Sequence, residues 1–351
     1  MADAGENKTL GEIMDRRTLL AAAPLLALPG LARAQEATPA APRPAPAPIS
    51  FPPPTLASKV VAEGLHFPEA PLVMNDGSLL FVQIEAKQIS RLKPDGTVAL
   101  VAQLDGGPNG LAIGPDKALY IANDGGRFSF AKRGEFNFPG AIPADFKGGS
   151  IQRLDLKTGK VATLYDTCEG KPLVAPDDLV MDRQGGMWIT EYGKARGDGA
   201  LYYARADGKA IKLVRGAMNA PNGIGLSPDG KQLHVSTGRQ LLTFDIKGPG
   251  ELGASASYPD AVHAALRDRS VADSLKVLAD NKVCVCTLIV GGISIFDKAG
   301  ATEFIQFADP MTTNLAFGGA DMRDAWITSS GAGKILKVRW PYPGLKPAYS
   351  A

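Results

Sequence analysis

Short apolar runs alternate with polar turns along most of the chain, in a pattern that repeats. Residues 79–82, 118–121 and 187–190 are such runs, and Gly- or Asp-containing turns separate them from neighbouring runs. Short apolar runs bounded by turn residues are typical of antiparallel strands joined by hairpins. The pattern therefore predicts an all-β fold.

Each repeat opens with the same short phrase, in which the second residue carries a side-chain oxygen. The six copies are Pro68-Glu69-Ala70, Pro108-Asn109-Gly110, Pro176-Asp177-Asp178, Pro221-Asn222-Gly223, Ala272-Asp273-Ser274 and Thr313-Asn314-Leu315. They begin roughly 40 to 50 residues apart, which is the spacing of β-propeller blades, except for one longer interval after residue 108. We interpret the longer interval as an insertion within a repeat.

Six repeats predict a six-bladed β-propeller over residues 59–351, with four-stranded antiparallel blades and a central metal site. Each blade would contain about 49 residues, enough for four strands and their turns. After the sixth phrase one clear strand remains, at residues 334–339, so we expect residues 59–62 to supply the outermost strand of that blade and close the ring. Residues 260–268 are the best candidate for a short helix.

The first 34 residues have the layout of an export signal. The pair Arg16-Arg17 precedes an apolar run at residues 19–31 and a small-residue cleavage pattern, Ala32-Arg33-Ala34, as in twin-arginine signals. The run is too short to span a bilayer. Because the arginine pair lies well inside the chain, Met14 is an alternative to Met1 as the true start.

Residues 35–58 are rich in Ala and Pro, a composition that favours an extended, semi-rigid linker. The layout therefore predicts three parts: an export signal at 1–34, a linker at 35–58 and the propeller at 59–351. We expect a periplasmic or secreted protein that does not associate with a membrane once the signal is removed.

Composition and charge narrow the possible partners. The 351 residues are 45% hydrophobic and 21% charged, which is ordinary for a soluble globular protein. Lys and Arg number 38 against 36 Asp and Glu, and no basic stripe suggests binding to nucleic acid or an anionic membrane.

The three cysteines do not form a disulfide scaffold, and we expect Cys284 and Cys286, two apart on one predicted strand, to be ordinary core residues.

The second residues of the six phrases are the candidate site. If each phrase opens the innermost strand of its blade, pseudo-sixfold symmetry carries these side chains to one height around the axis. They are Glu69, Asn109, Asp177, Asn222, Asp273 and Asn314. Three carboxylates in one funnel would repel each other unless a cation were bound. Because all the ligands are oxygens, we expect one divalent cation, with Ca²⁺ favoured, Mg²⁺ or Mn²⁺ as substitutes and Zn²⁺ possible but not indicated.

A simpler interpretation is that the phrases are turns. Asn109-Gly110 and Asn222-Gly223, taken alone, are hairpin signals. Six copies in one register, each continuing into an apolar strand, favour the ring of ligands instead. The histidines, His66, His234 and His263, share no repeat position and are expected at the surface or in packing, although His66 is close enough to Glu69 to line the pocket.

The chain resembles the gluconolactonase, regucalcin and senescence-marker family of six-bladed propellers, from about residue 60 to residue 345. The resemblance is carried by Pro68-Glu69-Ala70-Pro71, by the stretch at 221–230 that begins Pro221-Asn222-Gly223, and by Thr313-Asn314-Leu315. It implies that Glu69, Asn222 and Asp273 bind a single divalent ion, and that Asp177, with Asp178 beside it, lies in the pocket.

Three departures from the family pattern are evident. Gln83 replaces a common Asp, the fifth phrase reads Ala272-Asp273-Ser274 instead of Pro-Asp-Gly, and Thr190-Glu191-Tyr192-Gly193 replaces a frequent Thr-Asp-Pro. None removes a predicted ligand, but the third bears on which substrate is preferred.

The resemblance and the oxygen ring together predict a metal-dependent hydrolase of lactones or related small esters. The ion would polarise the carbonyl, and Asp273, or second Asp177, would take a proton from the attacking water. We expect Asn109, Asn314, Asp178 and Glu191 to contact the small-molecule substrate. The alternatives are a ligand- or protein-binding propeller with a structural Ca²⁺, and a phosphotriester hydrolase on the same site. The sequence makes no prediction of oligomeric state.

The insertion at residues 127–147 contains four phenylalanines, Phe128, Phe130, Phe136 and Phe138. They predict either an apolar lid over the funnel, which would admit less polar lactones than a sugar lactone, or simple packing of the insertion onto the blades.

Overall fold

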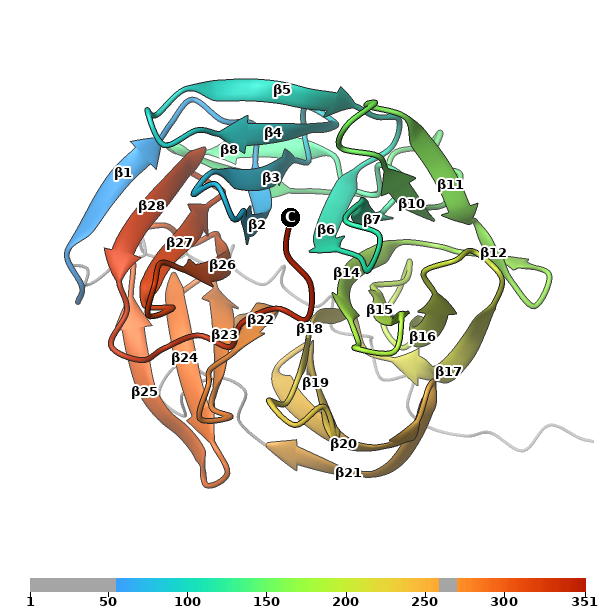
Figure 1. Cartoon of the computed structure of the whole chain (residues 1–351). Helices are drawn as coiled ribbons and strands as arrows, with labels where there is room; N and C mark the ends of the chain where they lie inside the picture. The colour runs from blue at the N-terminus through green and yellow to red at the C-terminus, as the bar shows by residue number, and fades with distance from the viewer. Residues whose placement is uncertain (1–54, 259–269) are drawn as a thin grey trace, which may run out of the picture. The chain divides into compact units, whose positions relative to one another are not determined.

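The structure, a computed structural model, describes residues 55–258 and 270–351, which form strands and turns with no helix among them (Figure 1). The predicted helix at 260–268, the export signal and residues 35–54 of the linker lie outside the described residues. No helix that could span a membrane is present in the described parts of the chain.

Six four-stranded antiparallel sheets surround a central axis, as predicted (Figure 1). From the axis outwards, the first three blades are β2 (Pro68–Val73), β3 (Leu79–Gln83), β4 (Gln88–Leu92) and β5 (Val98–Gln103); β6 (Pro108–Ile113), β7 (Leu119–Asn123), β10 (Ser150–Leu154) and β11 (Val161–Tyr165); and β14 (Pro176–Met181), β15 (Gly186–Glu191), β16 (Gly199–Arg205) and β17 (Ile211–Met218).

The last three blades follow the same order. They are β18 (Pro221–Leu226), β19 (Gln232–Thr237), β20 (Gln240–Gly248) and β21 (Glu251–Tyr258); β22 (Val271–Val277), β23 (Val283–Leu288), β24 (Gly292–Asp297) and β25 (Gly300–Gln306); and β26 (Thr312–Gly318), β27 (Asp324–Ser329), β28 (Lys334–Arg339) and β1 (Ser58–Ala62). Two short hairpins, β8–β9 (Phe130–Arg133, Phe136–Pro139) and β12–β13 (Thr167–Cys168, Lys171–Pro172), lie outside the blades.

The ring closes through the strand from the start of the described chain. β1 pairs with β28 in antiparallel register, with Ser58 opposite Val338 and Val60 opposite Leu336. This pairing confirms the prediction that residues 59–62 complete the sixth blade. It also covers an edge of β28 that would otherwise have unpaired backbone groups.

Six apolar clusters hold the blades together, one at each interface between neighbouring sheets. The apolar runs of the sequence supply them, because alternate residues of a strand face opposite sides of its sheet. Cys284 and Cys286 are free, fully buried members of the cluster between the fifth and sixth blades, as expected for core residues.

Candidate functional site

All six phrases lie at the start of an innermost strand, and each contains or adjoins a break in strand register. The register between the first and second strands shifts after Glu69, Pro108, Pro176, Pro221, Ala272 and Thr312. A β-bulge rotates the side chains that follow it out of the regular alternation. The repeated bulge therefore sets the direction in which the side chain of the second residue of each phrase points.

The two Asn-Gly pairs are not hairpin turns. Gly110 and Gly223 lie within β6 and β18, and neither has a positive φ. A Cβ added to Gly110 would lie 2.6 Å from the Cα of Asp178, and one added to Gly223 would lie 2.3 Å from the amide nitrogen of Leu275. Glycine is present because neighbouring innermost strands approach too closely for any side chain.

The six predicted side chains are buried, with exposed fractions between 1% for Asn314 and 9% for Asp273. Two amide–carboxylate hydrogen bonds join adjacent blades: Asn109 Nδ2 donates to Asp177 Oδ2 at 3.2 Å, and Asn314 Nδ2 donates to Glu69 Oε2 at 2.7 Å. The amide of Asn222 lies near Asp273 and acts to lower the pKa of that carboxyl. The structure thus brings residues that are up to 245 positions apart into one cluster.

Electrostatics within this cluster oppose ionisation. Burial raises the pKa of Glu69 to about 7, although the amide of Asn314 and the backbone N–H of Ala70 act in the opposite direction. Burial, followed by the charge of Asp273, raises the pKa of Asp177, and burial followed by the charge of Glu69 raises that of Asp273. A bound positive charge would therefore stabilise the ionised forms of these carboxylates.

The donor set fits a hard divalent cation. It consists of carboxylate and amide oxygens, which Ca²⁺ prefers. In the described parts of the chain, no three His, Cys, Asp or Glu side chains are grouped closely enough to hold a metal ion by themselves. The predicted set of Glu69, Asn222 and Asp273 combines two carboxylates with one amide oxygen.

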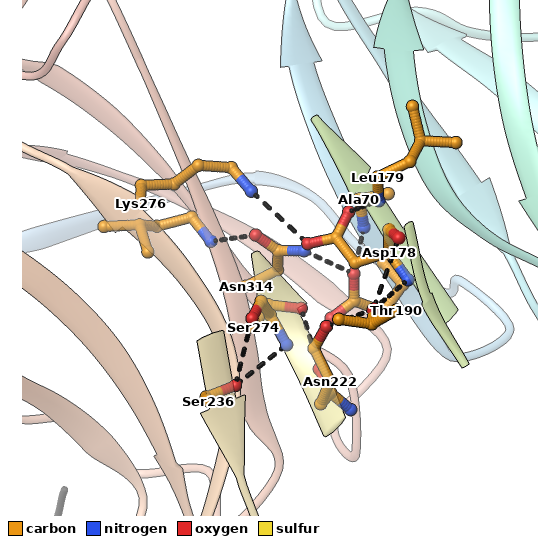
Figure 2. Close-up of polar contacts among 12 residues, drawn as sticks. Ala70, Asp178, Leu179, Thr190, Asn222, Ser236, Ser274, Lys276 and Asn314 are labelled. Carbon is orange, nitrogen blue, oxygen red and sulfur yellow. Dashed lines mark hydrogen bonds and ion pairs between the residues drawn. The ribbon is translucent and has the colours of Figure 1, made fainter. Parts of the chain in front are cut away.

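Asp178 lies beside this cluster with one carboxylate oxygen unsatisfied. Its Oδ1 accepts from the backbone N–H of Leu179 at 2.8 Å, while Oδ2 has no hydrogen-bond partner among the described residues. Lys276 Nζ lies 4.0 Å from Oδ2, and Figure 2 shows the lysine reaching towards Asp178 beside Asn314. Lys276 thus brings a fixed positive charge to the cluster.

Three hydroxyl side chains, which sequence reasoning missed, link three of the six phrases to the next blade. Thr190 Oγ1 accepts from the N–H of Asp178 and donates to the carbonyl of Asn222 at 2.5 Å, and Ser236 Oγ likewise joins Gly223 to the carbonyl of Asp273 (Figure 2). Between the sixth and first blades, Ser330 Oγ shares a hydrogen bond with Thr313 Oγ1 and donates to the carbonyl of Pro68 at 2.5 Å. Thr190 and Ser236 are each the last residue but one of a second strand, and this recurrence of Thr or Ser was the available signal.

Residues 67–331 match the sequence model of a family described as the SMP-30/Gluconolactonase/LRE-like region. The chain belongs to this family. Among curated relatives, this family member is 24% identical over 203 residues to a gluconolactonase of Zymomonas mobilis, and the match covers 51% of each chain. It is 24% identical over 266 residues to a lactonohydrolase of Aspergillus oryzae, and that match covers 67% of this chain and 56% of the relative. It therefore spans about half the length of the curated relatives it matches.

Solved structures show the same fold for this SMP-30/gluconolactonase family member. A gluconolactonase from Xanthomonas campestris superposes with a TM-score of 0.66 at 19% identity, covering 85% of this chain and 99% of the other. A calcium-binding regucalcin from Agrobacterium tumefaciens gives 0.65 at 17% identity, covering 83% and 98%.

Glu191 is the predicted site residue that the structure does not bring into the cluster of this family member. Its carboxylate accepts from the N–H of Val174 at 2.6 Å and from the hydroxyl of Tyr202 at 3.2 Å. Glu191 therefore holds the loop that leads into β14. Because Thr190 faces the fourth blade, its neighbour on the strand has to face the opposite way.

Tyr192, the next residue, lies near the cluster and was not among the predicted site residues. Burial, followed by the charges of Asp177 and Asp273, raises the pKa of its hydroxyl. Its ring meets that of Phe128 edge-on, with centroids 5.8 Å apart, and the guanidinium of Arg127 lies 4.6 Å from its centroid. Tyr192 thus connects the site to the insertion.

The insertion is fastened to three blades. In the third blade, Arg127 Nε donates to the carbonyl of Gly193 at 2.7 Å. In the first blade, Phe67 packs against Phe130 of the insertion, with ring centroids 4.9 Å apart. In the sixth blade, the carbonyl of Gly331 accepts from the N–H of Asn137 at 2.8 Å. Phe130, like Phe138, joins the cluster between the first and second blades. For these two residues, packing onto the blades is the correct interpretation.

His66 and His234 are placed as expected. His66 is an exposed residue whose Nδ1 lies 3.8 Å from Glu85 Oε2. His234 is buried against Thr243, and burial lowers its pKa to about 4. His263 lies outside the described residues.

Proposed function

We propose that this protein hydrolyses lactones or related small esters with the help of one divalent cation, most simply Ca²⁺. The observation that supports this most is the convergence of Glu69, Asn222 and Asp273, with Asp177 beside them, at the starts of the innermost strands. The family relatives named as a gluconolactonase and a lactonohydrolase support the same reaction class. In this reaction water adds to the carbonyl carbon, the ring C–O bond breaks, and a hydroxy acid is released.

The proposed ion ligands are Glu69, Asn222 and Asp273. When bound, a divalent cation would supply Lewis-acid polarisation of a substrate carbonyl. Asn314 fixes Glu69 for this role, because its Nδ2 donates to Glu69 while its Oδ1 accepts from the N–H of Leu315. We therefore assign Asn314 to positioning the ligand Glu69 more than to contacting substrate.

A carboxylate has to accept the proton of the attacking water, and Asp273 and Asp177 are the candidates. A carboxylate that binds a cation has a lowered pKa and is a weaker base. Asp177 is not among the proposed ligands, and burial raises its pKa, so it is the better proton acceptor. The amide of Asn109, which donates to Asp177, orients that carboxylate.

The test is a panel of lactones, aryl esters and phosphotriesters, assayed with chelator-treated protein and again after Ca²⁺ is added. We expect lactone turnover that depends on added ion and is lost in Glu69→Gln. Glu63→Gln, which alters an exposed carboxylate near the same strand, should keep full activity. Ca²⁺ binding without turnover of any lactone or ester would instead identify an ion-binding propeller. Turnover confined to phosphotriesters would identify a phosphotriester hydrolase.

We also propose that residues 1–34 direct export to the periplasm or the medium, as the Arg16-Arg17 pair and the following apolar run suggest. N-terminal sequencing of protein recovered from a periplasmic fraction tests this. A mature N-terminus just after Ala34 is expected, and an intact N-terminus on protein that stays in the cytoplasm would contradict it.

A further inference from the structure

The end of the central channel opposite the phrases contains a large cavity. It has a volume of about 1020 Å³, and it is lined by the later halves of the innermost strands and by the turns that follow them. Pockets of roughly 300–1,000 Å³ are typical of small-molecule sites. The cavity is therefore large enough for a ligand with a dozen or so non-hydrogen atoms.

A segment near residue 351 forms the roof of this cavity. Residues 345–350 line it, and Figure 1 shows this segment crossing the ring and ending near its centre. Backbone hydrogen bonds hold the segment at both sides: the N–H of Leu345 donates to Val277 in the fifth blade at 2.9 Å, and the N–H of Asn75 in the first blade donates to Ala351 at 2.9 Å. The roof covers part of this end of the channel, and we call the cavity beneath it the chamber.

The part of the chamber wall that the innermost strands form is apolar except at one place. Leu72, Leu111, Met181, Val277 and Phe317 line it from five different blades. Of the described residues that line it from the innermost strands, Lys276 is the one with a charged side chain.

The ammonium of Lys276 is incompletely paired. It lies 4.0 Å from Asp178 Oδ2, beyond hydrogen-bond distance, and the lysine side chain is 32% exposed. An ammonium has three donors, and a half-buried one gains from an acceptor that water or a ligand provides. Lys276 can therefore bind an anionic group at the inner end of the chamber.

The entrance side of the chamber is basic. Its charged lining residues beyond the innermost strands are Arg183, Lys231, Lys247, Lys337 and Lys346 against Asp182, Asp229 and Asp324. A second depression of about 640 Å³ shares Lys231, Lys247 and Asp229 with the chamber, so it continues to the surface between the fourth and fifth blades. In that depression the two shared lysines and Lys298 are matched by Asp229, Asp245 and Asp280, so the positive excess belongs to the chamber lining itself, where it favours an anion.

We infer that this chamber is a binding site for an amphiphilic carboxylate, with the carboxylate on Lys276 and an unbranched alkyl chain along the apolar wall. The alkyl chain would extend from Lys276 away from Glu69, Asn222 and Asp273, towards the other end of the channel. The inference goes beyond the proposed lactone hydrolysis and does not depend on it.

Two tryptophans that line the chamber, Trp188 and Trp326, report on its occupant. Dodecanoate with a terminal bromine quenches tryptophan fluorescence on contact, so we expect saturable quenching of the full chain. Replacing the carboxylate by an alcohol should weaken binding by about tenfold, because a charge-assisted hydrogen bond is lost. In Lys276→Met the acid and the alcohol should bind alike.

Two further variants make the test decisive. Ala112→Phe fills the chamber wall and should abolish quenching, while Lys209→Met, which alters an exposed lysine on an outer turn, should leave it unchanged. Circular dichroism confirms that each variant is folded. Quenching that does not saturate below ~1 mM, or equal affinities for wild type, Lys276→Met and Ala112→Phe, would overturn the inference. None of these readouts involves hydrolysis, so failure of the proposed function leaves them interpretable.

Discussion

At the scale of single residues, the cluster is organised by pairs in which an amide of one blade restrains a carboxylate of the next. Asn109 with Asp177 and Asn314 with Glu69 are such pairs. Each amide fixes a carboxylate by a hydrogen bond that favours its charged form, while burial favours the neutral form. The carboxylates are therefore oriented in advance and depend on a cation for their charge.

The role of Asp177 can be separated from that of the ion ligands. Asp177→Asn keeps the shape of the side chain and removes its basicity. We expect hydrolysis to fall by a factor of about 100 to 10,000, the usual contribution of a general base, while Ca²⁺ affinity changes little. Turnover and calorimetric Ca²⁺ titration measure the two effects. Loss of Ca²⁺ binding together with activity would place Asp177 among the ligands instead.

Asp124 predicts how the stability of the fold depends on pH. Burial raises its pKa to about 7, and its Oδ2 has no hydrogen-bond partner among the described residues. A carboxyl whose folded pKa is raised binds its proton more tightly in the folded state, so the stabilisation is complete below the unfolded value near 3.8 and is lost as pH rises towards 7.

We expect the free energy of unfolding to fall between pH 5 and pH 7 by up to about 1.36 kcal/mol per pH unit for this group, and Asp124→Asn to flatten that slope. Urea unfolding at several pH values in chelator measures it. The control is Asp95→Asn, since Asp95 is exposed and its pKa is lowered by hydrogen bonds to Thr97. An unchanged slope in Asp124→Asn would contradict the assignment.

At the scale of elements, the position of the site depends on close approach of neighbouring innermost strands. A Cβ on Gly223 would meet the backbone of Ser274 and Leu275, so Gly223→Ala should push β18 and β22 apart. Overpacking of this kind costs about 1–3 kcal/mol, and it would also separate Asn222 from Asp273. We expect lower melting temperature and weaker Ca²⁺ binding.

Gly216 in β17 provides the matched control. A Cβ there would have its nearest neighbour at 4.0 Å, so Gly216→Ala should be tolerated. Equal melting temperatures and Ca²⁺ affinities for the two variants would show that the approach of β18 to β22 does not position the ligands.

The repeat made the blades and the axial position of the phrases predictable, because strand periodicity and spacing are properties of the sequence alone. The direction of Glu191 was not predictable in this way. Thr190 and Glu191 are adjacent, and strand register decides which of them faces the next blade. The packing around these strands also includes close approaches between neighbouring blades, such as that of Gly110 to Asp178, which are far apart in the sequence.

At the scale of the whole molecule, closure of the ring depends on β1. Without it, β28 becomes an unpaired edge, and the sixth blade loses contacts such as Val60 opposite Leu336. Deletion of residues 1–62 should lower the melting temperature by several degrees and promote association through the exposed edge. Deletion of residues 1–54, which spares β1, is the control. Equal melting temperatures would show that β1 is dispensable.

The central claim is that pseudo-sixfold symmetry gathers Glu69, Asn222 and Asp273 into a single site for a divalent cation. Isothermal titration of chelator-treated protein with Ca²⁺ tests it most directly. We predict one Ca²⁺ per chain for wild type and Glu63→Gln, and no measurable binding for Glu69→Gln or Asp273→Asn. Ca²⁺ binding that is absent from wild type, or that persists unchanged in both ligand variants, would contradict the account.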